Sequence, residues 1–137
     1  MPAVNEARED IIRRTPLQWP TGWRRTHPSK RLPARFRTGY SRTTMPDALS
    51  RLEAEFRRWG IHDFAVSSNI PVKLNGLPYA GAAEPPDPGT AVYFRMRAGG
   101  RPKVFACDRW DRVADNLAAI AGHIAALRQV ERYAVGE

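Results

Sequence analysis

Apolar residues recur at spacings of three and four in two segments of the chain, as they do in helices that bury one side. The first stripe consists of Leu49, Leu52, Phe56 and Trp59. Thr44 precedes it as a possible cap, with Asp47 three residues later, and Pro46 falls in the first turn, where a missing N–H costs little. Gly60 is a natural C-terminal stop. We therefore predict a helix over residues 45–59.

The second stripe is longer and lies near the end of the sequence. It runs through Trp110, Val113, Leu117, Ile120, Ile124 and Leu127. Asp108 stands just before it, where a carboxylate can accept N–H groups, and Asp111 follows where negative charge favours the positive end of a helix. The pattern predicts a helix of about five turns that begins at an Asp108 cap.

Strict alternation between the two helices predicts a β-hairpin. In residues 91–97 the apolar positions 92, 94 and 96 alternate with Tyr93, Arg95 and Arg97, so one face is apolar and the other basic. Residues 103–107 form the second arm, after a turn that contains two glycines. We expect the cations of this hairpin to form one basic face: Arg95, Arg97, Arg101 and Lys103.

Two further short segments complete the predicted sheet. Residues 64–68 are typical of a strand, and residues 72–74 of a shorter one that ends at the turn signal Asn75-Gly76. The order helix, two strands, hairpin, helix predicts an α+β two-layer sandwich over residues 44–137. Its sheet would have about four, mainly antiparallel, strands, with both helices on one face.

Residues 1–43 show no such pattern. Residues 1–14 leave two alternatives open, a short helix and a frayed terminus. From residue 16 to residue 43 no period persists and Pro, Gly and Ser interrupt the run, which predicts an extended arm. Because the sheet needs cover on its second face, the arm is the candidate to pack there.

Charge changes this picture most in the arm. Residues 13–42 carry nine Arg and Lys and no Asp or Glu, whereas the rest of the chain carries 13 basic and 14 acidic residues. The net charge of +8 therefore comes from this one segment. Trp19, Trp23, Phe36 and Tyr40 are interleaved with the cations, a combination that points to a polyanionic partner, most often nucleic acid.

The arm and the hairpin together define the predicted interface. We expect phosphate contacts from Arg24, Arg25, Lys30, Arg31, Arg35 and Arg37. Stacking platforms for bases are Trp23, Phe36 and Tyr40. Arg95, Arg97 and Lys103 would extend the surface from the hairpin. The competing interpretation is that the aromatic residues pack into the domain and leave the arginines as a solvated rim.

Composition limits the remaining possibilities. A chain of 137 residues fits one domain with an adequate core. A single cysteine, Cys107, excludes an internal disulfide, and no apolar run approaches the roughly 20 residues of a membrane span. The N-terminus has no apolar segment typical of a secretory signal. We expect a cytoplasmic protein that binds no membrane, and the oligomeric state stays open.

Catalytic chemistry has one weak candidate. Asp108, Asp111 and Asp115 are the only clustered carboxylates and could hold Mg²⁺ for phosphodiester cleavage. Capping explains the first two, however, and Asp115 can pair with Arg112 one turn away. No zinc spacing or glycine-rich phosphate loop occurs, and Cys107 is expected to be a small core residue, so we predict no catalytic residue and no cofactor.

Several segments together resemble a known family. They are Leu17–Thr26, Val66–Asn69, Leu74–Pro78, Asp87–Phe94 and, most specifically, Phe105–Asn116. The chain resembles the N-terminal region of small bacterial and phage proteins labelled J-domain-containing or DnaJ-like, which tend to occur in prophages and other mobile elements. That label comes from a C-terminal J domain with a His-Pro-Asp loop that stimulates a partner chaperone. This sequence ends at Glu137 without one, and its His27-Pro28 is followed by Ser29, so we expect no co-chaperone activity.

What the resemblance implies is a mobile-element setting, where small proteins commonly handle DNA or disarm host defences. The leading hypothesis is a small non-enzymatic phage or mobile-element protein that binds nucleic acid, or a complex containing it, through the arm. A protein-binding inhibitor or adaptor of a host-defence complex, docking on an acidic surface, is the second hypothesis. A metal-dependent nuclease is the third.

Overall fold

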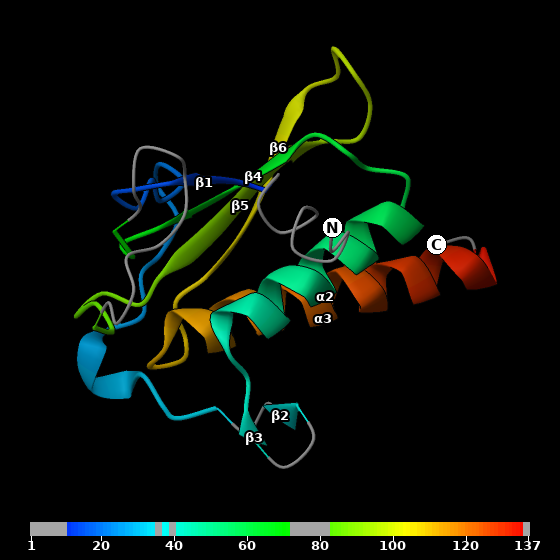
Figure 1. Cartoon of the computed structure of the whole chain (residues 1–137). Coiled ribbons are helices and arrows are strands. Elements are labelled where there is room, and N and C mark those ends of the chain that lie inside the picture. Colours follow the sequence, from blue (N-terminus) through cyan, green and yellow to red (C-terminus); the bar gives the residue numbers. More distant parts are fainter. Residues whose placement is uncertain (1–10, 35–36, 39–40, 72–82, 136–137) are drawn as a thin grey trace, which may run out of the picture.

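The computed structural model describes residues 11–34, 37–38, 41–71 and 83–135. Its elements, in chain order, are β1 (Ile12–Arg14), the 3₁₀ turn η1 (Pro28–Lys30), β2 (Arg37–Thr38), β3 (Ser41–Arg42), α2 (Met45–Arg58), β4 (Phe64–Ser68), β5 (Thr90–Arg95), β6 (Pro102–Cys107) and α3 (Val113–Tyr133). A four-stranded mixed sheet has α2 and α3 on one face (Figure 1), which confirms the predicted α+β fold. No helix in the described ranges is long and apolar enough to span a membrane.

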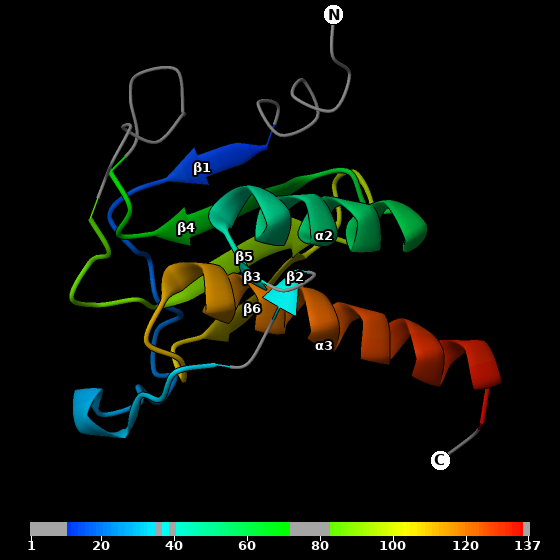
Figure 2. The same cartoon turned by 60° about the horizontal axis from the view of Figure 1, so that its bottom comes forward.

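The sheet has the strand order β1-β4-β5-β6, which can be followed in Figure 2. The β4/β5 and β5/β6 pairs are antiparallel, and β1 is parallel to β4. The predicted strand at 72–74 lies outside the described residues. For residues 12–14 both open alternatives, helix and frayed end, are wrong, because Ile12 to Arg14 pair with Ala65 to Ser67. Ile11 is buried and Ile12 is 47% exposed, as alternation in a strand requires.

The hairpin forms as predicted, but its basic face does not. Arg95 pairs with Pro102 and Phe94 with Lys103 across the two strands. Directly opposite residues point to the same face, so Lys103 lies with Phe94 on the helix-covered face, away from Arg95. The prediction of one basic face that includes both residues is therefore wrong, because the turn sets a register that composition does not reveal.

The first predicted helix is confirmed as α2. Its Thr44 cap accepts the backbone N–H of Asp47 at 3.3 Å. The side chains of Leu49, Leu52 and Phe56 are buried. The Phe56 ring lies 4.6 Å from that of Phe64 and 5.3 Å from that of Phe94, measured between centroids. The apolar stripe thus joins α2 to β4 and β5 through three aromatic rings.

The last helix begins later than predicted. Its first residue is Val113 and the capping position is Arg112, whose side chain makes no cap hydrogen bond. Glu84, from the segment before β5, accepts the Val113 N–H at 2.5 Å. The predicted Asp108 cap is wrong because that carboxylate accepts hydrogen bonds from Arg25 and Thr26 instead. The apolar stripe itself is confirmed, since Leu117, Ile120 and Ile124 are buried.

Asn116, on α3, connects three parts of the chain from a fully buried position. Its Nδ2 donates to the carbonyls of Pro88 at 2.8 Å and Trp110 at 3.1 Å. Its Oδ1 accepts from the N–H of Trp110 at 2.9 Å and from the Cys107 thiol at 3.3 Å. One side chain therefore holds the approach to β5, the end of β6 and the turn before α3.

Candidate nucleic-acid interface

The described part of the arm starts on the sheet face away from the helices. The Gln18 N–H donates to Ser67 Oγ at 2.7 Å, and the Tyr93 hydroxyl donates to the Gln18 carbonyl at 2.5 Å. Ser67 and Tyr93 alternate with core residues and so belong to that second face. The Leu17 N–H donates a hydrogen bond to Asn69 Oδ1 at 2.9 Å. This short segment of the arm is packed against the domain.

A tight turn then presents Trp23. The Trp23 N–H donates to the Pro20 carbonyl at 3.2 Å, and Gly22 has a φ of +80°, the left-handed conformation that glycine adopts without strain. The Trp19 indole donates to the Trp23 carbonyl at 3.1 Å. The backbone of Trp23 is therefore held on both sides, while its ring remains 48% exposed.

Two arginines of the arm anchor it to two carboxylates of the domain. Arg25 contacts Asp108 Oδ2 at 2.8 Å through Nε and Asp87 Oδ1 at 2.6 Å through Nη2. Arg31 Nη2 lies 3.4 Å from Asp108 Oδ2 and 3.6 Å from Asp87 Oδ1. The side chains of Arg31 and Asp108 are only 9% and 6% exposed. We call these four residues the anchor cluster.

Electrostatics within the anchor cluster favour the charged carboxylate. Burial acts to raise the pKa of Asp108, but hydrogen bonds from Arg25 and from Thr26 outweigh it and hold the pKa below its ordinary value. The Arg25 guanidinium also lies 4.5 Å from the centre of the Trp19 ring. The sequence predicted Arg25 and Arg31 as phosphate contacts, whereas the structure pairs both charges within the chain.

The three carboxylates that were the weak metal candidates are divided between two ion-pair groups. Asp108 belongs to the anchor cluster. Arg42 lies 3.3 Å from Asp115 and 3.8 Å from Asp111, and Arg112 lies 3.6 Å from Asp115. Burial raises the pKa of Asp115 even though both arginines oppose the shift. Within the described ranges, no group of three His, Cys, Asp or Glu side chains is arranged to hold a metal ion.

Trp23 borders an apolar groove between β6 and α3. The groove has a volume of about 380 Å³ and is lined by Trp23, Phe105, Ala106, Cys107, Ala119, Ile120 and His123. The rings of Phe105 and His123 meet edge to face, with centroids 5.0 Å apart. Burial raises the pKa of the Cys107 thiol, which points its hydrogen bond at Asn116. We call this feature the Trp23 groove.

The exposed cations of the predicted interface fall into two groups. Arg24 and Lys30 lie on the arm, and Arg97, Arg101 and Lys103 lie at the hairpin turn. None of these five forms an ion pair with another described residue, whereas Arg95 lies 3.7 Å from Asp63. Figure 1 shows the 3₁₀ turn of the arm and the hairpin turn at opposite ends of β6. The predicted surface is thus two patches separated by roughly 17–20 Å, the length of a six-residue strand.

The remaining predicted site residues lie where little is described. Arg35, Phe36 and Tyr40 are outside the described residues. Arg37 lies in β2, where it pairs with Arg42 of β3 through the backbone. Their part in the interface stays a prediction.

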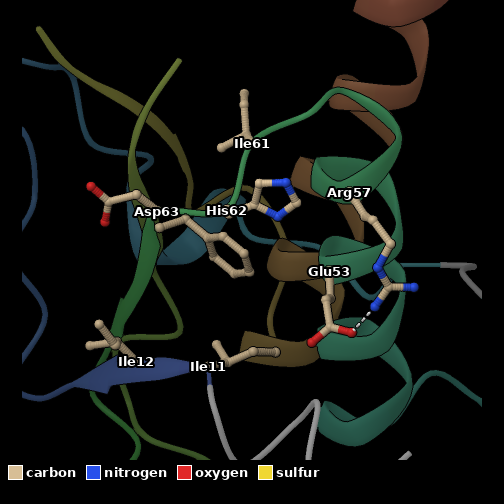
Figure 3. A pocket seen from close by; sticks show the side chains of 8 residues that line it. Ile11, Ile12, Glu53, Arg57, Ile61, His62 and Asp63 are labelled. Atoms are coloured by element: carbon tan, nitrogen blue, oxygen red, sulfur yellow. Dashed lines mark hydrogen bonds and ion pairs between the residues drawn. The ribbon is translucent and has the colours of Figure 1, made fainter. Parts of the chain in front are cut away.

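A second cavity, of about 320 Å³, lies at the other end of the sheet and is shown in Figure 3. It is lined by Ile11, Ile12, Glu53, Arg57, Ile61, His62, Asp63 and Phe64. Glu53 and Arg57 pair with each other one helical turn apart. Its charged side chains carry both signs, so it lacks the excess positive charge of a nucleic-acid surface.

Gly89 allows the arm to approach the domain, and we expect Gly89→Ala to loosen it. An added Cβ would lie 2.9 Å from Leu17 Cδ2 and 3.0 Å from Arg25 Nη2. Both atoms are the ends of flexible side chains, so the variant should lose little global stability and should instead displace Leu17 and Arg25 from their positions against the domain. Limited proteolysis within residues 19–31 should become faster. Gly122→Ala is the control, because nothing lies within 4 Å of its added Cβ and the change should slightly stabilise α3. Equal cleavage of Gly89→Ala and the parent chain would contradict this account of the arm.

No protein-family model, curated protein or solved structure matches this chain. The resemblance to the N-terminal region of J-domain-containing proteins, and the setting it implies, therefore remain predictions. The features of the molecule that bear on its function are the anchored arm, the Trp23 groove and the two basic patches.

Proposed function

We propose that this chain is a non-enzymatic nucleic-acid-binding protein and that the surface around Trp23 and Arg24 makes the principal contact. The observation that carries the proposal is that the cations of the arm have two different roles. Arg25 and Arg31 anchor the arm, and Arg24 and Lys30 remain exposed with no ion-pair partner among the described residues. An indole held outward beside free cations offers both of the contacts by which proteins bind nucleic acid.

The hairpin patch extends the proposed contact. Arg97, Arg101 and Lys103 lie at the far end of β6 from the arm. A strand of nucleic acid running along β6 would cover the intervening distance with roughly three to five nucleotides.

Loss of the arm cations should weaken binding in a salt-dependent way. We expect the double variant Arg24→Ala/Lys30→Ala to bind a single-stranded oligonucleotide about tenfold more weakly near 50 mM salt. The slope of log K against log salt should fall by about 1.4, because two phosphate contacts are lost. Fluorescence anisotropy between about 50 and 200 mM salt measures both quantities.

The matched control is Arg51→Ala/Arg132→Ala. Both residues are exposed on the helices, and neither forms an ion pair with another residue in the described part of the chain. The control removes the same charge, so it separates a local site from a general attraction of a +8 protein. Absence of binding by the parent chain near 50 mM salt, or equal losses in the two double variants, would refute the proposal.

A further inference from the structure

The Trp23 groove combines an aromatic lining with cations close by along the chain, at Arg24 and Lys103, and we infer that it receives an unstacked base of a single-stranded nucleic acid. The inference rests on the proposed function and adds to it the strandedness and the part of the ligand that is recognised. Trp23 comes from the arm, Phe105 and Cys107 from β6, and His123 from α3.

The dimensions and lining of the groove suit a flat ring. Its volume of about 380 Å³ falls within the roughly 300–1,000 Å³ of small-molecule sites. Ala106 and Ala119 leave the space open, and the rings of Trp23, Phe105 and His123 provide surfaces against which a base can stack or pack. The thiol of Cys107 is kept protonated by burial and adds a polarisable contact without reactive chemistry.

Charge around the groove favours a nucleotide over an apolar peptide. Arg24 directly follows Trp23 in the sequence and is exposed. Lys103 lies two residues before Phe105 on the same face of β6, about 7 Å along the strand. None of the described residues that line the groove is Asp or Glu. A base within a strand has a phosphate on either side, so cations flanking an aromatic groove match it. A base stacked inside a duplex cannot enter.

Trp23 is positioned before any ligand arrives. The turn from Pro20 to Trp23, the left-handed Gly22 and the hydrogen bond from the Trp19 indole hold its backbone. Because the platform is already ordered, little conformational entropy is lost when a base stacks on it. Trp23 therefore differs from a tryptophan that is exposed only because it has no packing partner, since hydrogen bonds order its backbone.

A backbone without bases tests the inference. Two oligomers of about ten nucleotides are compared, one of thymidines and one of abasic sites with the same phosphates. The parent chain should bind the thymidine oligomer about tenfold more tightly, and Trp23→Ala should bind both equally. Ala119→Leu, which fills the groove, should also remove the preference for the thymidine oligomer. Trp23→Phe should keep part of the preference, and circular dichroism verifies that each variant is folded.

The outcomes separate the two proposals. Equal affinity of the parent chain for both oligomers would overturn the base site and leave phosphate binding intact. Equal affinity for a thymidine strand and for its duplex with adenosine would also overturn it. Failure to bind either oligomer near 50 mM salt would refute the proposed function itself. Quenching of indole fluorescence by the thymidine oligomer that persists undiminished in Trp23→Phe would also overturn the base site, because the base would then lie against another tryptophan.

Discussion

Replacement of Asn116 by alanine is expected to lower the free energy of unfolding by about 4 kcal/mol. The side chain is fully buried and makes four hydrogen bonds. Its truncation removes the hydrogen bonds that this side chain makes to the Pro88 carbonyl and to the backbone N–H and carbonyl of Trp110. Each buried polar group left unpaired costs about 1–3 kcal/mol. Urea denaturation followed by circular dichroism measures the loss.

Two further variants test whether the hydrogen bonds, rather than the volume, are responsible. Asn116→Asp keeps the shape but turns a carboxylate oxygen towards two carbonyls, so it should destabilise at least as much as alanine. Gln129→Ala, on an exposed position of the same helix, should change stability by less than about 0.5 kcal/mol. A loss below about 1 kcal/mol in Asn116→Ala would mean that the network contributes little.

Asp108→Asn should cost about 3 kcal/mol at neutral pH, because it removes the charge that Arg25 and the buried Arg31 share. The loss should depend on pH. The folded pKa of Asp108 lies below its ordinary value, so the carboxylate stabilises the fold fully above about pH 5. That contribution is lost as the pH falls through the folded pKa, and the parent and variant should then converge.

The matched control is Asp63→Asn. Asp63 also pairs with an arginine, Arg95, but at 3.7 Å and with 66% of its side chain exposed. An exposed pair of this kind contributes less than about 1 kcal/mol, and high salt should abolish most of it. A difference between the parent chain and Asp108→Asn that stays constant down to about pH 3, or an equal loss in Asp63→Asn, would contradict the role given to the anchor cluster.

Local patterns predicted the elements that depend on near neighbours. The α2 helix, the β5–β6 hairpin and the stripe of α3 follow from spacing, capping and turn chemistry within a few residues. The strand β1 could not be found in this way, because its partner β4 lies about 50 residues further along. A strand of three residues is too short to show a periodicity, and the residues that precede it show no pattern either.

The site was missed in part for the same reason. Asp108 satisfies the local rules for a helix cap. Its carboxylate instead accepts a hydrogen bond from Arg25, which lies 83 residues away in sequence. The Trp23 groove brings together three segments, and His123 had no signal beyond an exposed position on a helix. The available hint was the stretch from Trp19 to Trp23, since Pro and Gly between two tryptophans suit a turn that displays a ring.

The large sequence separation between the arm and the carboxylate of Asp108 has a consequence during translation. Thr26 and Asp108 are 82 residues apart, and Leu17 and Asn69 are 52 apart. At the usual rate of translation, on the order of ten seconds pass between the appearance of the arm and that of Asp108. Until Asp87 and then Asp108 have been synthesised, Arg25 and Arg31 lack the two carboxylates that pair with them in the folded chain. Pairing with Asp108 therefore withdraws two cations late in synthesis, and under the proposed function Arg24 and Lys30 are the arm cations left to contact a ligand.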